Sequence, residues 1–369
     1  MRGTLPRILA VMLAIMPGAL AFGQNDLPAD LHSKSSLSPS EEQTIANWTL
    51  ANWALVDGEA PDDARDARRR LVEPLLRAET TASFRLAMDR AIGAQLQAAM
   101  NGDDVFRGVN AALLSGWLGT DRSVRSLTLA IQGQQVAIRF SSVAGLGNAF
   151  RVAGIAPVAF QAQVGDQAVV ALAAVLGSSN DRSMLDAAAK ALIEAISVPE
   201  AAIAGFGARS GERLTEAVGE RLNTLPIDDQ LGARVPPLLR AMAEIRGAIT
   251  QRRGNVSTAW RDEILEMYGR AGALGFRYVR AERAGTLDGA DAEGTRNAVE
   301  TAIRVAGTMP TLLTLDPAVQ SNLRGLDLAG NFANAPQDGG NGFQRATNDL
   351  IRLLGNQFRM PRDRFNTDG

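Results

Sequence analysis

The residue types that most often carry catalysis are scarce in this chain of 369 residues, which contains one histidine and no cysteine. A serine or cysteine nucleophile needs a base held within hydrogen-bond reach, and the single histidine, His32, lies in a stretch that we expect to be flexible. Zinc sites are built mainly from His and Cys side chains. We therefore assign no catalytic, cofactor-binding or metal-binding residue, and we expect no cofactor.

Carboxylates are the remaining candidates for chemistry, since the chain holds 40 Asp and Glu residues. Two carboxylates at working distance support glycoside hydrolysis, but the sequence does not indicate which pair would meet. The acidic run from Asp288 to Glu293 lacks the ligand spacing of a calcium loop, and helix capping by Asp291 and Glu293 explains it. A carboxylate-dependent envelope glycan hydrolase stays open as an alternative function.

Two glycine-rich motifs have some features of nucleotide sites. The first, Gly145-Leu-Gly-Asn-Ala-Phe, has Phe150 where a dinucleotide fingerprint needs its last glycine, and we interpret it as the C-terminal cap of a helix. The second, from Gly205 to Gly211, lacks the lysine of a phosphate-binding loop and is interpreted as a turn. Neither motif predicts a nucleotide site.

The N-terminus has the pattern of a signal peptide. Arg2 and Arg7 precede an apolar run from Ile8 to Leu20, and small residues that suit cleavage end at Ala21 or Gly23. The run is too short to span a membrane, and a chain without cysteine has no lipid-anchor site. Residues 1–23 are predicted to be cleaved, leaving a periplasmic or secreted protein with no stable membrane insertion.

The charge balance bears on possible partners. Loss of the two N-terminal arginines would change the formal net charge from −2 to about −4. A negative protein is repelled by phosphate backbones and by anionic headgroups. We therefore expect no nucleic-acid partner.

Amphipathic helices account for most of the remaining pattern. The segment Ser38-Pro39-Ser40-Glu41 has the form of a capping box at a helix start. Further helices are predicted around Leu127, Val143, Val170, Leu192, Leu214, Met242, Met267 and Val299. Breaks are predicted at Gly133, Pro157, residues 178–179, Pro199, Pro226, Pro236-Pro237, Gly254 and Gly307, with a loop over residues 330–342. The tryptophans are expected to pack in the core, namely Trp48, Trp53, Trp117 and Trp260.

Three of these helices are similar in sequence. The segments that start at Arg107, Arg139 and Leu185 each place small or apolar residues in the middle and a leucine at the eighth position. The pattern resembles the HEAT-repeat family, in which two antiparallel helices joined by an Asp-containing turn stack on the next pair. The resemblance covers about residues 80–225 at irregular spacing. Leu185 and Lys190 depart from the arginine and alanine that are usual in the family.

The resemblance implies an all-α fold, an irregular HEAT-like α-solenoid of antiparallel helix pairs, with an irregular helical bundle as the alternative. The segments expected along the chain are a signal peptide (1–23), a disordered leader (24–39), an N-terminal helical segment (40–79), HEAT-like repeats (80–226), a C-terminal helical region (227–360) and a disordered tail (361–369). We expect an exported, noncatalytic interaction or scaffold protein of the bacterial cell envelope. Its partner would be an unidentified protein or peptide bound along the inner helices.

Overall fold

The computed structural model describes residues 27–56, 58, 61–287 and 292–367, and this part of the chain is all-α, as predicted. The α-helices are α1 (Pro39–Val56), α2 (Pro61–Val72), α3 (Ala82–Met100), α4 (Val105–Leu118), α5 (Asp121–Ala130), α6 (Val136–Ile155), α7 (Ala162–Ser178), α8 (Arg182–Ile196), α9 (Phe206–Thr224), α10 (Leu231–Gln251), α11 (Thr258–Arg283), α12 (Ala292–Thr308), α13 (Pro317–Gly325), α14 (Leu328–Ala333), α15 (Ala335–Asp338) and α16 (Asn341–Phe358). Short 3-10 turns are η1 (Leu31–Ser33), η2 (Glu73–Leu76), η3 (Pro310–Leu312) and η4 (Arg362–Arg364). Among the described residues no strand forms, and the bridge between Thr120 and Ala159 is isolated.

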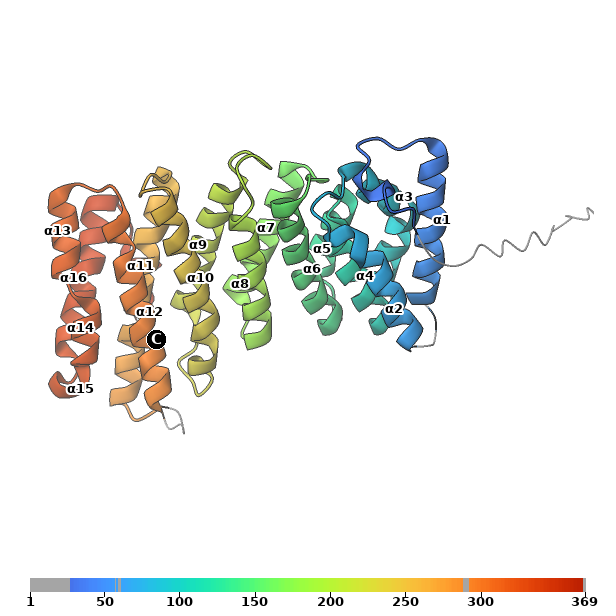
Figure 1. The fold of residues 1–369 in the computed structure, drawn as a ribbon. Helices are drawn as coiled ribbons and strands as arrows, with labels where there is room; N and C mark the ends of the chain where they lie inside the picture. The colour runs from blue at the N-terminus through green and yellow to red at the C-terminus, as the bar shows by residue number, and fades with distance from the viewer. Residues whose placement is uncertain (1–26, 57, 59–60, 288–291, 368–369) are drawn as a thin grey trace, which may run out of the picture.

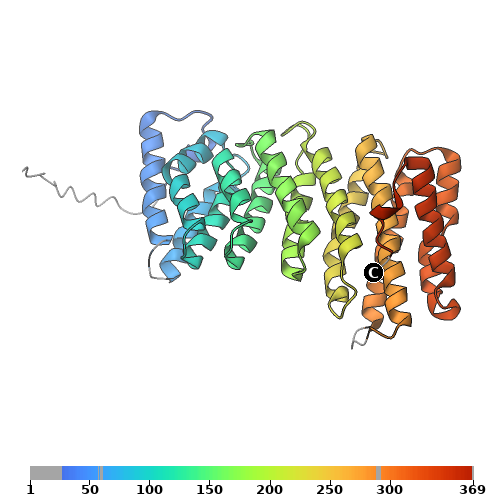
Figure 2. The same ribbon diagram turned by 180° about the vertical axis from the view of Figure 1, so that it is seen from behind.

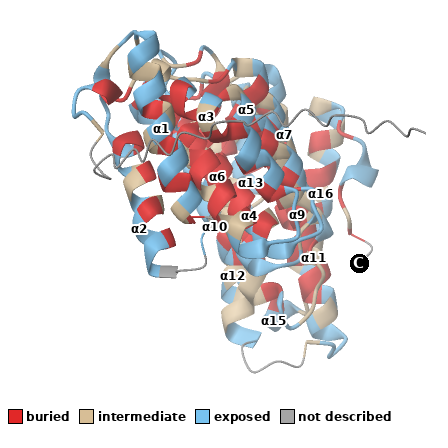
Figure 3. Cartoon of the chain, turned by 90° about the vertical axis from the view of Figure 1, so that its right-hand side faces the viewer, coloured by how far each residue is buried: buried red, intermediate tan, exposed pale blue. Residues whose placement is uncertain are grey.

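The helices stand side by side in one long array that begins at α1 and ends with α13 to α16 (Figures 1 and 2). Contacts divide most of them into two rows. In the even row, α2, α4, α6, α8, α10, α12 and α14 each pack on the next, and in the odd row α1, α3, α5, α7, α9, α11 and α16 do the same. Each even helix also packs on the odd helix that precedes it, up to α12. Seen end-on in Figure 3, buried and exposed residues share individual helices, as expected of helices that bury one face.

Most predicted helices are present at the predicted places, and the differences have local causes. Each predicted apolar centre lies inside a helix, from Leu127 in α5 to Val299 in α12. The break predicted at Pro236-Pro237 is wrong, because both prolines lie inside α10, where the neighbours Val235 and Leu238 are fully buried. Packing of that apolar face outweighs the hydrogen bonds that proline cannot donate. The loop predicted over residues 330–342 contains the end of α14, α15 and the start of α16.

Glycines set the distance between neighbouring even helices. A Cβ on Gly116 of α4 would clash with the backbone of Gly145 of α6, and a Cβ on Gly145 would lie 2.7 Å from the Ala112 carbonyl oxygen. On the other side of α6, a Cβ on Gly147 would lie 3.2 Å from Cα of Ala191 in α8. The predicted C-terminal cap at Gly145 is therefore wrong. This glycine lies in the middle of α6 and allows two helix backbones to touch.

Two buried arginines tie the ends of helices to their neighbours. Arg277 of α11 donates from Nη1 to the carbonyl of Leu225 and from Nη2 to that of Leu222, each at 2.8 Å, at the C-terminal end of α9. Arg85 of α3 donates to the carbonyls of Trp117 and Leu75. Burial lowers the pKa of each guanidinium to about 10, so both stay protonated at neutral pH. The negative ends of helix dipoles compensate their charges in place of carboxylates.

The N-terminal leader is ordered where the structure describes it, which corrects the disorder expected for residues 24–39. Leu31 and His32 are buried, and His32 Nε2 lies 3.2 Å from Glu79 Oε1. The His32 carbonyl accepts a hydrogen bond of 2.9 Å from the Thr81 backbone N–H. Pairing with the start of α3 satisfies the leader backbone, and the sequence offers no periodicity that would have indicated it.

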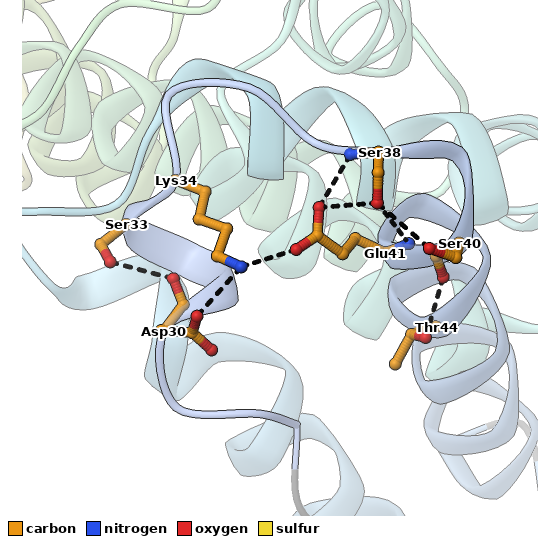
Figure 4. A network of polar contacts seen from close by, with 7 residues as sticks. All are labelled: Asp30, Ser33, Lys34, Ser38, Ser40, Glu41 and Thr44. Carbon is orange, nitrogen blue, oxygen red and sulfur yellow. Dashed lines mark hydrogen bonds and ion pairs between the residues drawn. The ribbon is translucent and has the colours of Figure 1, made fainter.

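Polar side chains join the leader to α1 (Figure 4). Lys34 Nζ lies 3.0 Å from Asp30 Oδ2 and 2.6 Å from Glu41 Oε1. The predicted capping box is present, since Glu41 Oε2 accepts from the Ser38 N–H at 2.8 Å and Ser38 Oγ accepts from the Glu41 N–H at 3.4 Å. The Lys34 ammonium and the Ser38 donors lower the pKa of Glu41 to about 2.

The C-terminal segment is also ordered over residues 361–367, which corrects the disordered tail expected there; residues 368–369 lie outside the described residues. Phe365 is buried and lies over Gly269 of α11, where a Cβ would clash with its ring. The Asn366 N–H donates to Asn223 Oδ1 at 2.7 Å, and Arg364 Nη1 donates to Glu266 Oε2 at 2.6 Å. A single aromatic residue in a polar segment anchors this contact, so helical periodicity gave no sign of it.

Candidate functional site

The even row carries a groove over three successive helices, which we name the α6–α8–α10 groove. Its volume is about 710 Å³. The lining residues are Phe140, Ala144, Gly147, Asn148 and Arg151 of α6, Arg182, Ser183, Asp186, Ala187, Lys190, Ala191, Ile193 and Glu194 of α8, and Pro236, Pro237, Arg240 and Glu244 of α10. The bottom of the groove is formed by small residues, because Gly147 and Ala191 let α6 and α8 approach closely.

The three helices point the same way, so their N-terminal ends share one end of the groove. Arg151 of α6 meets Glu194 of α8 near the C-terminal ends, and Gly147 meets Ala191 one turn earlier. Arg234 of α10 donates to the carbonyl of Asn180, which precedes α8. The end with the helix N-termini therefore carries the positive ends of the helix dipoles.

Ion pairs hold part of the charge in the groove. Asp186 accepts from Lys190, whose Nζ lies 2.7 Å from Oδ2, and from Arg240 of the next helix. Burial would raise the pKa of Asp186, but the bonds from these two cations outweigh it and lower the pKa. Arg151 donates from both Nε (3.0 Å) and Nη2 (2.6 Å) to a single oxygen of Glu194. The second oxygen of that carboxylate stays available.

Other polar groups of the groove have no partner within the described part of the chain. Arg182 and Glu244 are exposed and form neither an ion pair nor a side-chain hydrogen bond there. The side chains of Asn148 and Ser183 likewise form no hydrogen bond to described residues. These groups can bind a ligand without first breaking an internal contact.

Exposed apolar side chains adjoin the groove at its N-terminal end. Phe140 is 41% exposed, Val136 at the start of α6 is 69% exposed, and Phe106 at the start of α4 is 55% exposed. The two helix starts lie together, because Gly108 of α4 packs against Ile138 of α6. Neighbouring exposed apolar residues of this size are typical of contact surfaces.

A second hollow of about 640 Å³ lies on the same row, between α2 and α4. Half-buried Trp117 and Leu113 line one side, and Arg65, Arg68 and Arg69 line the other. Arg68 donates to Asn110 Oδ1 at 2.7 Å. Arg65, Arg68 and Arg69 thus give this hollow a basic side.

Buried carboxylates meet at a different place, where α9, α11 and the C-terminal segment join. Glu266 is 2% exposed; Arg270 Nη2 lies 2.5 Å from its Oε1 and Arg364 Nη1 lies 2.6 Å from its Oε2. Burial, together with the charges of Glu266 and Glu216, raises the pKa of half-buried Glu263 to about 7. The sequence predicted no particular acid pair, and the C-terminal arginine that completes this cluster lies far from it along the chain.

The structure also locates the other residues considered for sites. Trp53 and Trp260 are buried as expected, and Trp260 Nε1 donates to Thr215 Oγ1 at 2.8 Å, whereas Trp48 and Trp117 are half-buried. Gly205 precedes α9 with a φ of +67°, but residues 206–211 lie inside α9, so the turn predicted from Gly205 to Gly211 is wrong beyond its first residue. Residues 288–291 of the acidic run lie outside the described residues. In the described part of the chain no cluster of His, Asp or Glu could hold a metal ion.

Comparisons with known proteins add little to this description. No family model matches the chain, and no curated protein matches it. Solved structures do match, among them a crystal structure described as an engineered protein, with 16% sequence identity, 87% of this chain and 93% of the other covered, and a TM-score of 0.30. Among the described residues, none of the helices has the length and hydropathy needed to cross a bilayer.

Proposed function

We propose that this protein is a noncatalytic interaction or scaffold protein, built as an irregular HEAT-like α-solenoid, that binds a protein or peptide partner along its even row. The helix packing supports a solenoid, because successive helices of each row pack on one another and each even helix up to α12 packs on the odd helix before it. The groove over α6, α8 and α10 is the observation that carries the proposal, since it holds polar groups without internal partners beside exposed Phe140.

Export to the cell envelope is part of the same proposal. It rests on the signal-peptide pattern of residues 1–23, which lie outside the described residues. The described residues begin at Leu27, which packs against the core only a few positions after either cleavage position. N-terminal sequencing of the protein from the envelope fraction tests it, and a start at Phe22 or Gln24 is expected.

Site-specific photocrosslinking tests the interaction function. A benzophenone amino acid in place of Phe140 is expected to form a covalent adduct with a defined partner in the native envelope. The matched control carries the same group in place of Arg352 of α16, which is 73% exposed and far from the groove in the chain. Equal adducts from both positions, or none from position 140, would contradict a groove-directed interaction.

Carboxylate-dependent hydrolysis of envelope glycan is a second candidate, favoured by Glu263. A general acid needs a raised pKa and a second carboxylate nearby. Glu263 has a raised pKa, and the charges of Glu266 and Glu216 contribute to it. The assay measures release of reducing ends from cell-wall and storage polysaccharides. A hydrolase would lose that activity in the Glu263→Gln variant, whereas a scaffold shows none in either form.

A further inference from the structure

We propose that the α6–α8–α10 groove binds an extended peptide segment in which an acidic side chain lies beside an aromatic or aliphatic one. This inference rests on the proposed interaction function and names the chemistry of its partner. The acidic side chain would pair with Arg182 and Lys190 of α8. The apolar side chain would pack on Phe140 of α6 and Pro236 of α10.

The charge of α8 favours a carboxylate ligand. Asp186 is shared by Lys190 and Arg240, so one carboxylate balances two cations. Arg182, one residue into the same helix, has no ion pair within the described residues. Arg182 thus places a positive charge without an ion pair at the groove end where the helix dipoles are also positive. A single carboxylate placed there would gain charge-assisted hydrogen bonds without displacing an existing pair.

The acids of the groove exclude a ligand of high negative charge. Glu244 of α10 has no ion pair within the described part, and Glu194 has one oxygen free of Arg151. Repeated phosphates, as in a nucleic acid, would meet these carboxylates within the span of a few residues. A peptide of mixed composition avoids that repulsion, and a basic side chain of the peptide could pair with Glu244.

Apolar contacts and backbone bonding favour a peptide over a free small acid. Phe140 and Pro236 are exposed on opposite sides of α8, and small residues (Ala144 and Ala187) lie between them. Asn148 and Ser183 offer a side-chain amide and a hydroxyl that can bond to a peptide backbone. Helix axes about 8–10 Å apart make the crossing from α6 to α10 about 20 Å, which about six extended residues cover.

Selection of random peptides on the full chain tests the inference. Phage-displayed peptides of about twelve residues, about twice the length that crosses the groove, are selected on the immobilised protein. The enriched sequences are expected to place Asp or Glu beside Phe, Trp, Leu or Ile. One enriched peptide is then labelled with fluorescein and titrated by anisotropy at low salt.

Charge reversal in the groove is expected to weaken that peptide. The double variant Arg182→Glu, Lys190→Glu should raise Kd at least about ten-fold, equivalent to about 1.4 kcal/mol, and added salt should weaken wild-type binding. The double variant Arg345→Glu, Arg352→Glu is the matched control for charge, because both arginines are exposed on α16 and their contacts among the described residues stay within that helix. Its Kd should stay within about two-fold of wild type.

Three results would overturn the inference. These are enrichment of basic or purely apolar peptides, a Kd that charge reversal leaves unchanged, and displacement of the peptide by a DNA oligonucleotide at lower concentration than by the unlabelled peptide. If no peptide is enriched while position 140 still crosslinks a partner, the acidic-peptide inference fails and the interaction function stands. If crosslinking is also absent, both fail.

Discussion

The α6–α8–α10 groove and the junction of α9, α11 and the C-terminal segment both gather arginines and carboxylates, but they hold them differently. In the groove, Arg182 and Lys190 are exposed. Lys190 pairs with Asp186 at the surface, and Arg182 has no ion pair among the described residues. At the junction, Glu266 and Arg277 are buried, and each has a partner from a distant segment, namely Arg364 for Glu266 and the end of α9 for Arg277. Buried charge that loses its partner is costly, whereas exposed charge is cheap to exchange. The same residue types therefore stabilise the fold in one region and stay free for a ligand in the other.

Replacing Arg277 should cause the largest loss of stability. In Arg277→Ala the carbonyls of Leu222 and Leu225 lose their donor inside the protein, and each buried acceptor left unpaired costs about 1–3 kcal/mol. We expect the free energy of unfolding to fall by about 3–5 kcal/mol in a urea titration. Arg182→Ala is the control and should change it by less than about 0.5 kcal/mol. Similar losses in both variants would remove the distinction between the two regions.

Phe365 tests whether the C-terminal segment belongs to the junction. The Phe365→Ala variant loses the packing of the ring on Gly269, and we expect the Arg364–Glu266 ion pair next to it to weaken. The expected loss is about 2–3 kcal/mol, less than for a core phenylalanine because the segment can detach. Thermal unfolding measures it. Leu129→Ala is the control, because Leu129 is an exposed apolar residue whose truncation should leave the core intact. An unchanged Tm for Phe365→Ala would mean that the segment adds no stability.

The stability of the junction should depend on pH through Glu263. Burial beside Glu266 and Glu216 raises the pKa of Glu263 from its ordinary value of 4.5 to about 7. Between these values the folded state binds more protons than the unfolded state, so stability is full below about pH 4.5 and falls as the pH rises to about 7. The Glu263→Gln variant should lack this decrease in the free energy of unfolding, which amounts to about 1–2 kcal/mol after allowance for solvent screening. Urea titrations from pH 4.5 to 8 measure it, and parallel curves for both proteins would contradict it.

The smallest effect is expected in the groove itself. Lys190→Ala removes one of the two cations on Asp186, but Arg240 continues to pair with it. Surface ion pairs contribute about 0–1 kcal/mol, so stability should change by less than about 0.5 kcal/mol. Differential scanning calorimetry measures the change. A loss above about 2 kcal/mol would show that the groove charges are structural.

Sequence patterns predicted the helices well because each helix buries a stripe of its own. The centres at Leu127, Val143 and Met267 all lie within helices, and the capping box at Ser38 is present. Periodicity is a local property, so it indicates which face is buried without naming the partner. It failed at Pro236-Pro237, where long-range packing outweighs a local helix breaker.

Helical periodicity could not predict the groove or the ordered segments around His32 and Phe365. Phe365 and His32 are buried by contacts to helices far away in sequence, and single residues carry no period. The groove combines residues from three helices, and the register of α6 against α8 depends on Gly147 meeting Ala191. One signal was present, since Lys190 departs from the alanine of the repeat pattern and lies in the groove wall. A departure of this kind becomes informative only once the register is known.

The backbone contacts at Gly116, Gly145 and Gly147 have a consequence for recognition. Where two helices touch through their main chains, no long side chain lies between them. The helices therefore cannot slide along each other by a change of side-chain conformation. The three helices α4, α6 and α8 are thus held at one spacing before any ligand arrives. The entropic cost of association then falls mainly on the ligand, which must adopt an extended shape on a template that is already set.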